Sequence, residues 1–226
     1  MIFTEEQLTE NHLKFIETIK LTCGDRSDLL LKMYSDLEFS LKYSPASSYK
    51  HLHNAFKGGY IDHVLRVLEF TFQVYDTWSR NGLDVSNFTP DELAFAALHH
   101  DLGKLGFPHP ELSRYVDNES EWHRENLGKD YNINDYIPFT LIQHQSLFLL
   151  QLYGVKVSFN EYLAIMTHDG LYDEVNKPYL LAKSVESKMR CNISYILHQG
   201  DFLAAQFEYE RWKSVDKPWL LNNTNT

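Results

Sequence analysis

Residues 96–104 read AALHHDLGK, and this stretch decides how the rest of the chain is interpreted. It continues a segment with a strong helix-start signal, because Thr89 can cap the helix and Glu92, three residues later, completes a capping box. We expect this helix to end near His100 and Asp101. An adjacent imidazole and carboxylate can both reach one ion where a helix ends, since the geometry there is not confined to one helix face, and both are ligands of divalent metals. A His-Asp pair is common, however, so the rest of the sequence must supply further ligands.

Three other candidate ligands lie on separate predicted helices. His63 stands near the start of an amphipathic segment that follows a Gly-Gly pair, His168 closes a second helix, and Asp201 lies on the last one. Inward-facing histidines and carboxylates from several helices are how helical bundles build metal sites. The sequence therefore predicts a metal centre between helices.

The periodicity of the chain favours an all-α fold with a single domain. Apolar residues recur at helical spacing almost everywhere, and alternating strand patterns are scarce. We expect helices with apolar stripes at about 13–19, 29–41, 61–80, 90–101, 146–153, 158–168 and 192–212. Residues 103–140 and 170–178 are expected to be irregular, and a loop as long as the first is often functional.

Several local strings resemble one known family. The order His63, then His100-Asp101, then Asp201 matches the H…HD…D signature of the HD superfamily. GGYIDH at 58–63 resembles the start of a helix in many HD phosphohydrolases, and ILHQGD at 196–201 resembles their L-H-x-x-D segment. The stretch that opened this section resembles their A-x-L-x-HD-[LI]-G-K segment.

The resemblance covers about residues 50–212 and implies an organisation of the chain. Residues 1–49 would be N-terminal helices that pack on the core, residues 50–213 would be an HD phosphohydrolase domain, and residues 214–226 would be a C-terminal tail. The implied fold is a single-domain helical bundle with its metal centre between helices. His63, His100, Asp101 and Asp201 would be the metal ligands.

The number of ions stays open, with two favoured over one. In binuclear relatives the residue matching Asp101 bridges the ions, and further histidines hold the second. His168 and His144 are the candidates. THDG at 167–170 resembles the H-x-G segment of HD proteins related to 3′-5′ exoribonucleases, whereas QHQ at 143–145 matches no such string. Mn, Mg, Co, Ni and Fe cannot be distinguished.

A second set of residues is predicted to act on the substrate. Asp101 and Lys104 are the candidate catalytic residues, with Lys104 placed to neutralise a phosphate oxygen. Arg66 shares a helix face with His63 and would meet either a phosphate or Glu69. The other candidates for substrate binding are His123 and Lys177.

Composition limits the classes of partner. The formal net charge of -10 disfavours duplex nucleic acid and anionic membranes, but a bound cation would still admit a small anionic substrate. The two cysteines cannot form a disulfide framework, which favours a reducing cytoplasm. The start of the chain lacks the pattern of a signal peptide, and the longest apolar run is too short to span a bilayer. Homo-oligomerisation stays open.

The resemblance implies a metal-dependent phosphohydrolase, and we expect a nucleoside mono- or triphosphate to be hydrolysed by metal-activated water. A nuclease or cyclic-nucleotide phosphodiesterase on the same site is the main alternative, and a di-iron HD oxygenase is a further one. A non-catalytic binding protein is disfavoured, because buried ligands without a metal would leave costly polar groups.

Overall fold

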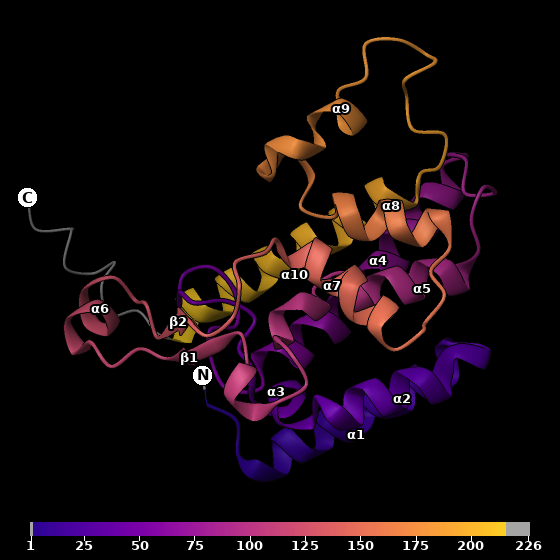
Figure 1. Cartoon of the computed structure of the whole chain (residues 1–226). Coiled ribbons are helices and arrows are strands. Elements are labelled where there is room, and N and C mark those ends of the chain that lie inside the picture. The colour runs from indigo at the N-terminus through magenta and orange to yellow at the C-terminus, as the bar shows by residue number, and fades with distance from the viewer. Residues whose placement is uncertain (1, 216–226) are drawn as a thin grey trace, which may run out of the picture.

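The structure, a computed structural model, describes residues 2–215 and is built mainly of helices (Figure 1). The helices are α1 (Glu5–Thr22), α2 (Ser27–Asp36), α3 (Glu38–Tyr43), α4 (Gly59–Arg80), α5 (Pro90–His99), α6 (Glu121–Asn126), α7 (Ile142–Leu152), α8 (Phe159–Thr167), α9 (Lys177–Leu180) and α10 (Ile193–Val215). The all-α class predicted from the sequence is confirmed. Of the expected tail, residues 216–226 lie outside the described residues.

Short elements occupy the segments that were expected to be irregular. Strands β1 (Tyr115–Asp117) and β2 (Tyr131–Ile133) pair antiparallel beside α6. The 3-10 helices are η1 (Gly24–Arg26), η2 (Leu102–Leu105), η3 (Pro110–Leu112), η4 (Gly170–Tyr172) and η5 (Glu174–Asn176). The prediction of long irregular loops was therefore wrong in detail, because short elements carry too little periodicity to show in the sequence.

Two predicted helical stripes needed correction. The stripe over 29–41 belongs to two helices, because the chain leaves helical geometry at Leu37 (φ -99°, ψ 10°) and both Leu37 and Leu41 are buried. In α1 the buried residues include Phe15 and Ile19, whereas Leu13 is 62% exposed. The capping boxes predicted before α5 and α8 are both confirmed.

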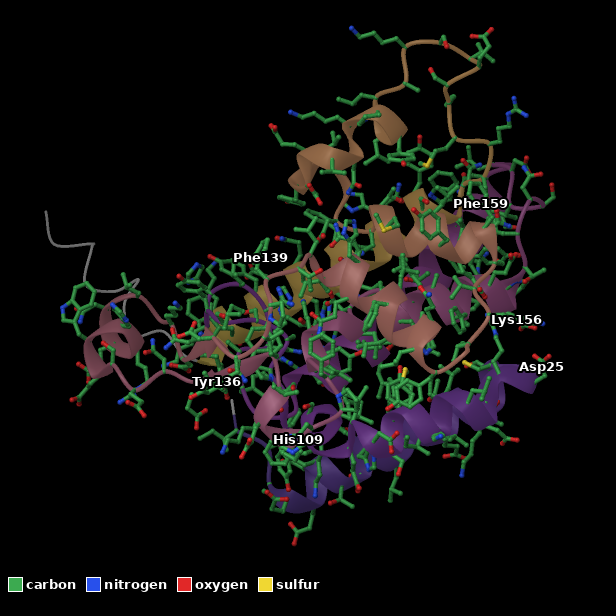
Figure 2. The ribbon with its side chains drawn as sticks, viewed as in Figure 1. Asp25, His109, Tyr136, Phe139, Lys156 and Phe159 are labelled. Carbon is green, nitrogen blue, oxygen red and sulfur yellow. The ribbon has the colours of Figure 1, made fainter. Side chains whose placement is uncertain are left out.

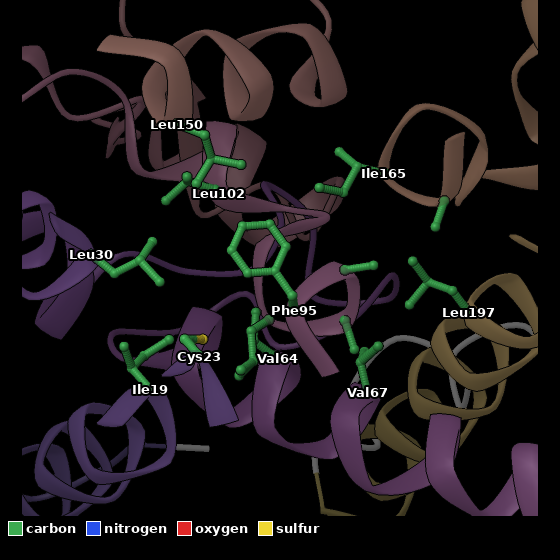
Figure 3. Packing of buried hydrophobic residues seen from close by; sticks show 14 of the residues in the cluster. Ile19, Cys23, Leu30, Val64, Val67, Phe95, Leu102, Leu150, Ile165 and Leu197 are labelled. Atoms are coloured by element: carbon green, nitrogen blue, oxygen red, sulfur yellow. The ribbon is translucent and has the colours of Figure 1, made fainter. Parts of the chain in front are cut away.

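The core runs from the N-terminal helices to α10 without interruption. Figure 3 shows side chains from α1, α2, α4, α5 and α10 around Phe95, including Ile19, Leu30, Val64 and Leu197. Every residue of α5 from Leu93 onwards is buried. The fold thus encloses the helix that leads into His100-Asp101 on all sides.

The most extensive contact between two helices joins α4 and α10, and a glycine allows their close approach. A Cβ atom on Gly200 would lie 2.3 Å from Thr71 Oγ1 and 2.7 Å from Thr71 Cα. Because Thr71 is fully buried, neither helix can move apart without opening the core. Gly200 directly precedes Asp201, so this contact sets the position of Asp201 relative to α4.

The outer surface carries scattered large apolar side chains. Tyr136, Phe139 and Phe159 are exposed (Figure 2). Isolated exposed apolar residues are ordinary in proteins and need no special explanation. No helix within residues 2–215 is both long and apolar enough to cross a membrane.

We predict that Gly200→Ala lowers the free energy of unfolding by about 1–3 kcal/mol, because the added methyl group meets backbone atoms of α4. The higher helix propensity of alanine, worth about 1 kcal/mol, offsets only part of this cost. Urea unfolding measures the change. The exposed Glu210→Ala on the same helix is the control and should stay within about 0.5 kcal/mol of the parent. A Gly200→Ala protein as stable as the control would contradict the close contact.

Candidate metal centre

The start of α4 is shaped so that two histidines face each other. Gly58 has a φ of 80°, and a Cβ atom on Gly59 would lie 2.1 Å from the backbone oxygen of Asn54. The Gly-Gly pair therefore lets the preceding loop fold back tightly against the helix. That loop brings the ring of His53 to 4.8 Å from the ring of His63, measured between centroids.

The end of α5 presents His100 and Asp101 from a turn that α7 supports. The hydroxyl of Ser146 on α7 donates a hydrogen bond to the His100 carbonyl (3.1 Å) and accepts one from the Gly103 amide (2.8 Å). A Cβ atom on Gly103 would lie 2.3 Å from the Ile142 carbonyl oxygen. Helix α7 thus provides hydrogen-bond partners for the His100 carbonyl and the Gly103 amide, which the end of α5 leaves unpaired.

The last two candidate ligands come from α8 and α10. His168 follows the final turn of α8, and its carbonyl accepts a hydrogen bond from Nδ1 of His198 (2.7 Å). The imidazole of His198 packs against Gly170, where a Cβ atom would lie 2.2 Å from its ring. Because His198 and Asp201 are one turn apart on α10, this contact holds the end of α8 beside Asp201.

The ligand atoms of these segments converge. Nε2 of His63 lies 3.5 Å from Asp101 Oδ2 and 3.3 Å from Asp201 Oδ1. Nε2 of His100 lies 3.4 Å from Asp101 Oδ2, and Nε2 of His168 lies 3.7 Å from Asp101 Oδ1. Ligands bound to one ion at about 2.1 Å lie roughly 3–3.5 Å apart, so these spacings fit shared ions.

Three overlapping groups have ligand atoms within 4.8 Å of one another: His53, His63 and Asp101; His63, His100 and Asp201; His100, Asp101 and His168. Asp101 belongs to two of the groups and offers a different oxygen to His63 and to His168. This arrangement suits a carboxylate that bridges two ions.

The hydrogen bonds show that the site suits a cation. Nδ1 of His100 bonds to the Ala97 carbonyl and Nδ1 of His168 bonds to the Ile165 carbonyl, both at 2.8 Å. A carbonyl only accepts, so both rings carry their proton on Nδ1 and turn the lone pair of Nε2 inward. Nε2 of His63 and Nε2 of His100 are buried without a hydrogen-bond partner. Such atoms are costly unless an ion binds them.

The carboxylates keep their charge inside the protein. Burial raises the pKa of Asp101, but Lys104 and His100 outweigh it and hold this pKa well below its ordinary value. Burial likewise raises the pKa of Asp201, and His63 and His100 reverse the shift to a net lowering. Two negative charges therefore face the Nε2 atoms of the histidines at neutral pH.

The same charge interactions raise the pKa values of His63 and His168. Burial lowers the pKa of His63, yet Glu208 and the two site carboxylates raise it well above its ordinary value. Burial lowers the pKa of His168, and Asp169 and Asp101 raise it to about 9. Without an ion the site therefore takes up protons in its place.

Lys104 lies at the rim of the same cluster. Its Nζ is 2.6 Å from Asp101 Oδ2 and 3.1 Å from His53 Nε2. Burial lowers the pKa of Lys104, but Asp101 reverses the shift and raises it above its usual range, so the side chain stays an ammonium.

A cavity of about 480 Å³ opens above these groups. Asp101, Lys104, His168 and Asp201 line it. The remaining lining residues are His51, Leu52, His53, Asp169, Tyr172, His198, Phe202, Ala205, Gln206 and Tyr209.

The structure places four predicted site residues elsewhere. His144 is exposed on α7, because the neighbouring Gln143 and Gln145 take the buried positions. His123 is exposed on α6, and Lys177 is exposed and pairs with Glu174 at 2.6 Å. None of these three belongs to the ligand groups or lines the cavity.

Arg66 also turns away from the cavity, and it pairs with neither a phosphate site nor Glu69. Its guanidinium binds Asp62 at 2.8 Å and Glu208 at 2.7 Å. Sequence reasoning offered the helix neighbour Glu69 as its partner and missed Glu208, which is distant along the chain. His53 was not among the predicted ligands, although its position near the Gly-Gly turn made a purely structural role less certain than for His51 or His123.

We predict that His168→Ala lowers the number of Mn²⁺ or Co²⁺ ions bound at saturation from about two to about one, because His168 reaches the Asp101 oxygen that faces away from His63. Elemental analysis after gel filtration in excess metal measures this. His144→Ala is the matched control and should bind as much metal as the parent. A parent protein that saturates at one ion would exclude the second ion.

We also predict that metal affinity rises with pH up to about 9, since a bound ion must displace the proton of His168, whose pKa is raised to about 9. Each pH unit below that value should weaken binding by up to about tenfold per displaced proton. By the same linkage, the metal-free fold loses stability as pH rises from 6.5 through about 9. A metal affinity that does not change over this pH range would show that metal binding does not displace a proton from His168.

Comparison with known proteins agrees with the geometry. Residues 60–131 match the family model of the HD domain, and this segment contains His63, His100 and Asp101. The searches of curated proteins and of solved structures each found no significant match. HD domains bind divalent metals and are generally metal-dependent hydrolases. This segment of the chain is therefore similar to the HD domain, and the match supports membership of the HD-domain superfamily.

Proposed function

We propose that the protein hydrolyses the phosphate ester of a nucleoside monophosphate. The HD domain implies metal-dependent phosphohydrolase activity. The nucleotide is the part that we add, and one observation carries it: a single cavity joins the His/Asp cluster and Lys104 to a wall of aromatic side chains.

The size and lining of the cavity support a nucleotide. Its volume of about 480 Å³ falls in the range of about 300–1,000 Å³ that is typical of small-molecule sites. Tyr172, Phe202 and Tyr209 also line it, and aromatic faces stack well on bases. Phe202 and Tyr209 lie on α10 with Asp201, so one helix contributes both a candidate metal ligand and aromatic side chains to this cavity.

The charge of the cavity supports one phosphate rather than three. Among the described residues that line it, Lys104 is the one lysine or arginine, whereas Asp101, Asp169 and Asp201 are acidic. A triphosphate spreads its charge over a longer chain and is ordinarily met by several cationic groups. The same shortage of cations argues against a nucleic-acid polymer, whose binding depends on many phosphate contacts.

The residues of the site then have distinct roles. A divalent ion supplies Lewis acidity and lowers the pKa of a water ligand. Lys104 has three donor hydrogens, so it can keep its bond to Asp101 and donate another to a phosphate oxygen. Because it stays charged, it opposes the negative charge that develops on phosphate oxygens in the transition state. Asp101 thereby both binds metal and holds the catalytic ammonium in place.

We propose a small anionic nucleotide as the partner and the cytoplasm as the location, which the two free cysteines suit. A nuclease, a cyclic-nucleotide phosphodiesterase and a di-iron oxygenase would use the same ligand cluster, and a substrate screen separates them.

We predict that purified protein with Mn²⁺ or Co²⁺ releases phosphate from nucleoside monophosphates faster than from triphosphates or cyclic nucleotides, as resolved by chromatography. Lys104→Ala should lower kcat by on the order of 10²-fold while metal content stays the same. Lys32→Ala, at an exposed position on α2, is the control and should keep full activity. Turnover of cyclic nucleotides alone, or a normal kcat for Lys104→Ala, would overturn the proposal.

A further inference from the structure

We propose that Glu208 is a positioning residue for the metal centre and that it acts through His63. Glu208 lies on α10, seven residues after Asp201, and two helical turns place both on the same side of that helix. Its side chain is completely buried. The sequence offers no motif that marks this residue, and it is distant from His63 along the chain.

The carboxylate of Glu208 bonds the outer nitrogen of His63. Nδ1 of His63 lies 3.1 Å from one Glu208 oxygen and 3.3 Å from the other. A carboxylate that has lost its proton only accepts, so Nδ1 must carry the proton. The lone pair of His63 is then on Nε2, the atom that faces Asp101 and Asp201.

His63 differs in this respect from the other two histidines of the cluster. His100 and His168 donate from Nδ1 to backbone carbonyls, which are neutral acceptors. A carboxylate behind the ring makes the imidazole a stronger metal ligand than a carbonyl does, because it favours positive charge on the ring. We therefore expect the ion beside His63 to bind more tightly than the ion beside His168.

A chain of charges stabilises Glu208 in its buried position. Arg66 donates to Glu208 at 2.7 Å and to Asp62 at 2.8 Å. Arg211 binds the same Asp62 at 2.6 Å and the Asn54 side chain at 2.8 Å. The negative charge of Glu208 is thereby paired, which a buried carboxylate requires.

This network gives Arg66 a function other than the substrate contact expected from the sequence. Arg66 lies three residues after His63 on α4, and it orients Glu208 toward that histidine. The inference rests on the metal centre of the proposed function but not on the substrate. Its test is therefore metal binding, which does not depend on which phosphate ester is hydrolysed.

The experiment compares Glu208→Gln with Glu210→Gln. Glutamine keeps the shape and an acceptor oxygen but removes the charge behind His63, whereas Glu210 is exposed on the same helix. Competition with a chelator measures the affinity for Co²⁺. Glu208→Gln should weaken the tighter ion by roughly 10- to 100-fold, the usual effect of losing such a partner, and Glu210→Gln by less than about twofold. Equal affinities in both variants and the parent would overturn the proposal.

A double substitution separates positioning from a general structural role. If Glu208 acts through His63, adding Glu208→Gln to His63→Ala should change the remaining affinity by less than about twofold, because the coupled partner is already absent. A further loss as large as in the parent background would show that Glu208 acts on the fold rather than on the ligand.

A measurement on the parent protein covers the case in which Glu208→Gln does not fold. Nitrogen-15 spectra of the imidazole groups, recorded with Zn²⁺ bound, distinguish a ring with a proton on Nδ1 from the other tautomer. We expect His63 to carry its proton on Nδ1 and to bind Zn²⁺ through Nε2. The opposite tautomer would contradict the inference, whatever the substrate is.

Discussion

Imidazole nitrogens and carboxylates from four separate helical segments meet in one largely buried cluster, and the other elements pack so as to hold them there. Nε2 of His63 and of His100 have no hydrogen-bond partner there, and they face Asp101 and Asp201. Burying such groups unpaired costs several kcal/mol. A divalent cation satisfies the nitrogens and the carboxylates together. The raised pKa values of His63 and His168 are the response of the same groups when protons are the available cations.

Helix ends and close helix contacts make this meeting possible. His100 and His168 stand just beyond the ends of α5 and α8, where each ring bonds a carbonyl of the preceding turn. Two glycines remove the side chains that would keep the elements apart, Gly103 beneath α7 and Gly200 against α4. The enclosed position of α5 then holds the His-Asp turn rigidly. The geometry of this site therefore depends on close helix packing next to the ligands.

Local sequence patterns predicted the helix caps and most of the candidate ligands, but they could not predict pairs of residues that are distant along the chain. The capping boxes of α5 and α8 involve residues three apart, so the sequence shows them directly. The signature strings named five residues that the fold brings together, His63, His100, Asp101, His168 and Asp201. His144 lies outside the cluster, because the phase of α7, which the sequence does not show, buries the two neighbouring glutamines instead. Glu208 and His53 were missed because their partners are fixed by tertiary contacts.

Diffraction would show directly whether this cluster holds divalent metal. Crystals soaked in Mn²⁺ would be measured at a wavelength where manganese scatters anomalously. We expect a peak within about 2.0–2.3 Å of Nε2 of His63 and of His100 and of a carboxylate oxygen of Asp101. A second peak beside His168 would show two ions. Full soaking with no peak at these atoms, or with manganese at the surface alone, would contradict the claim.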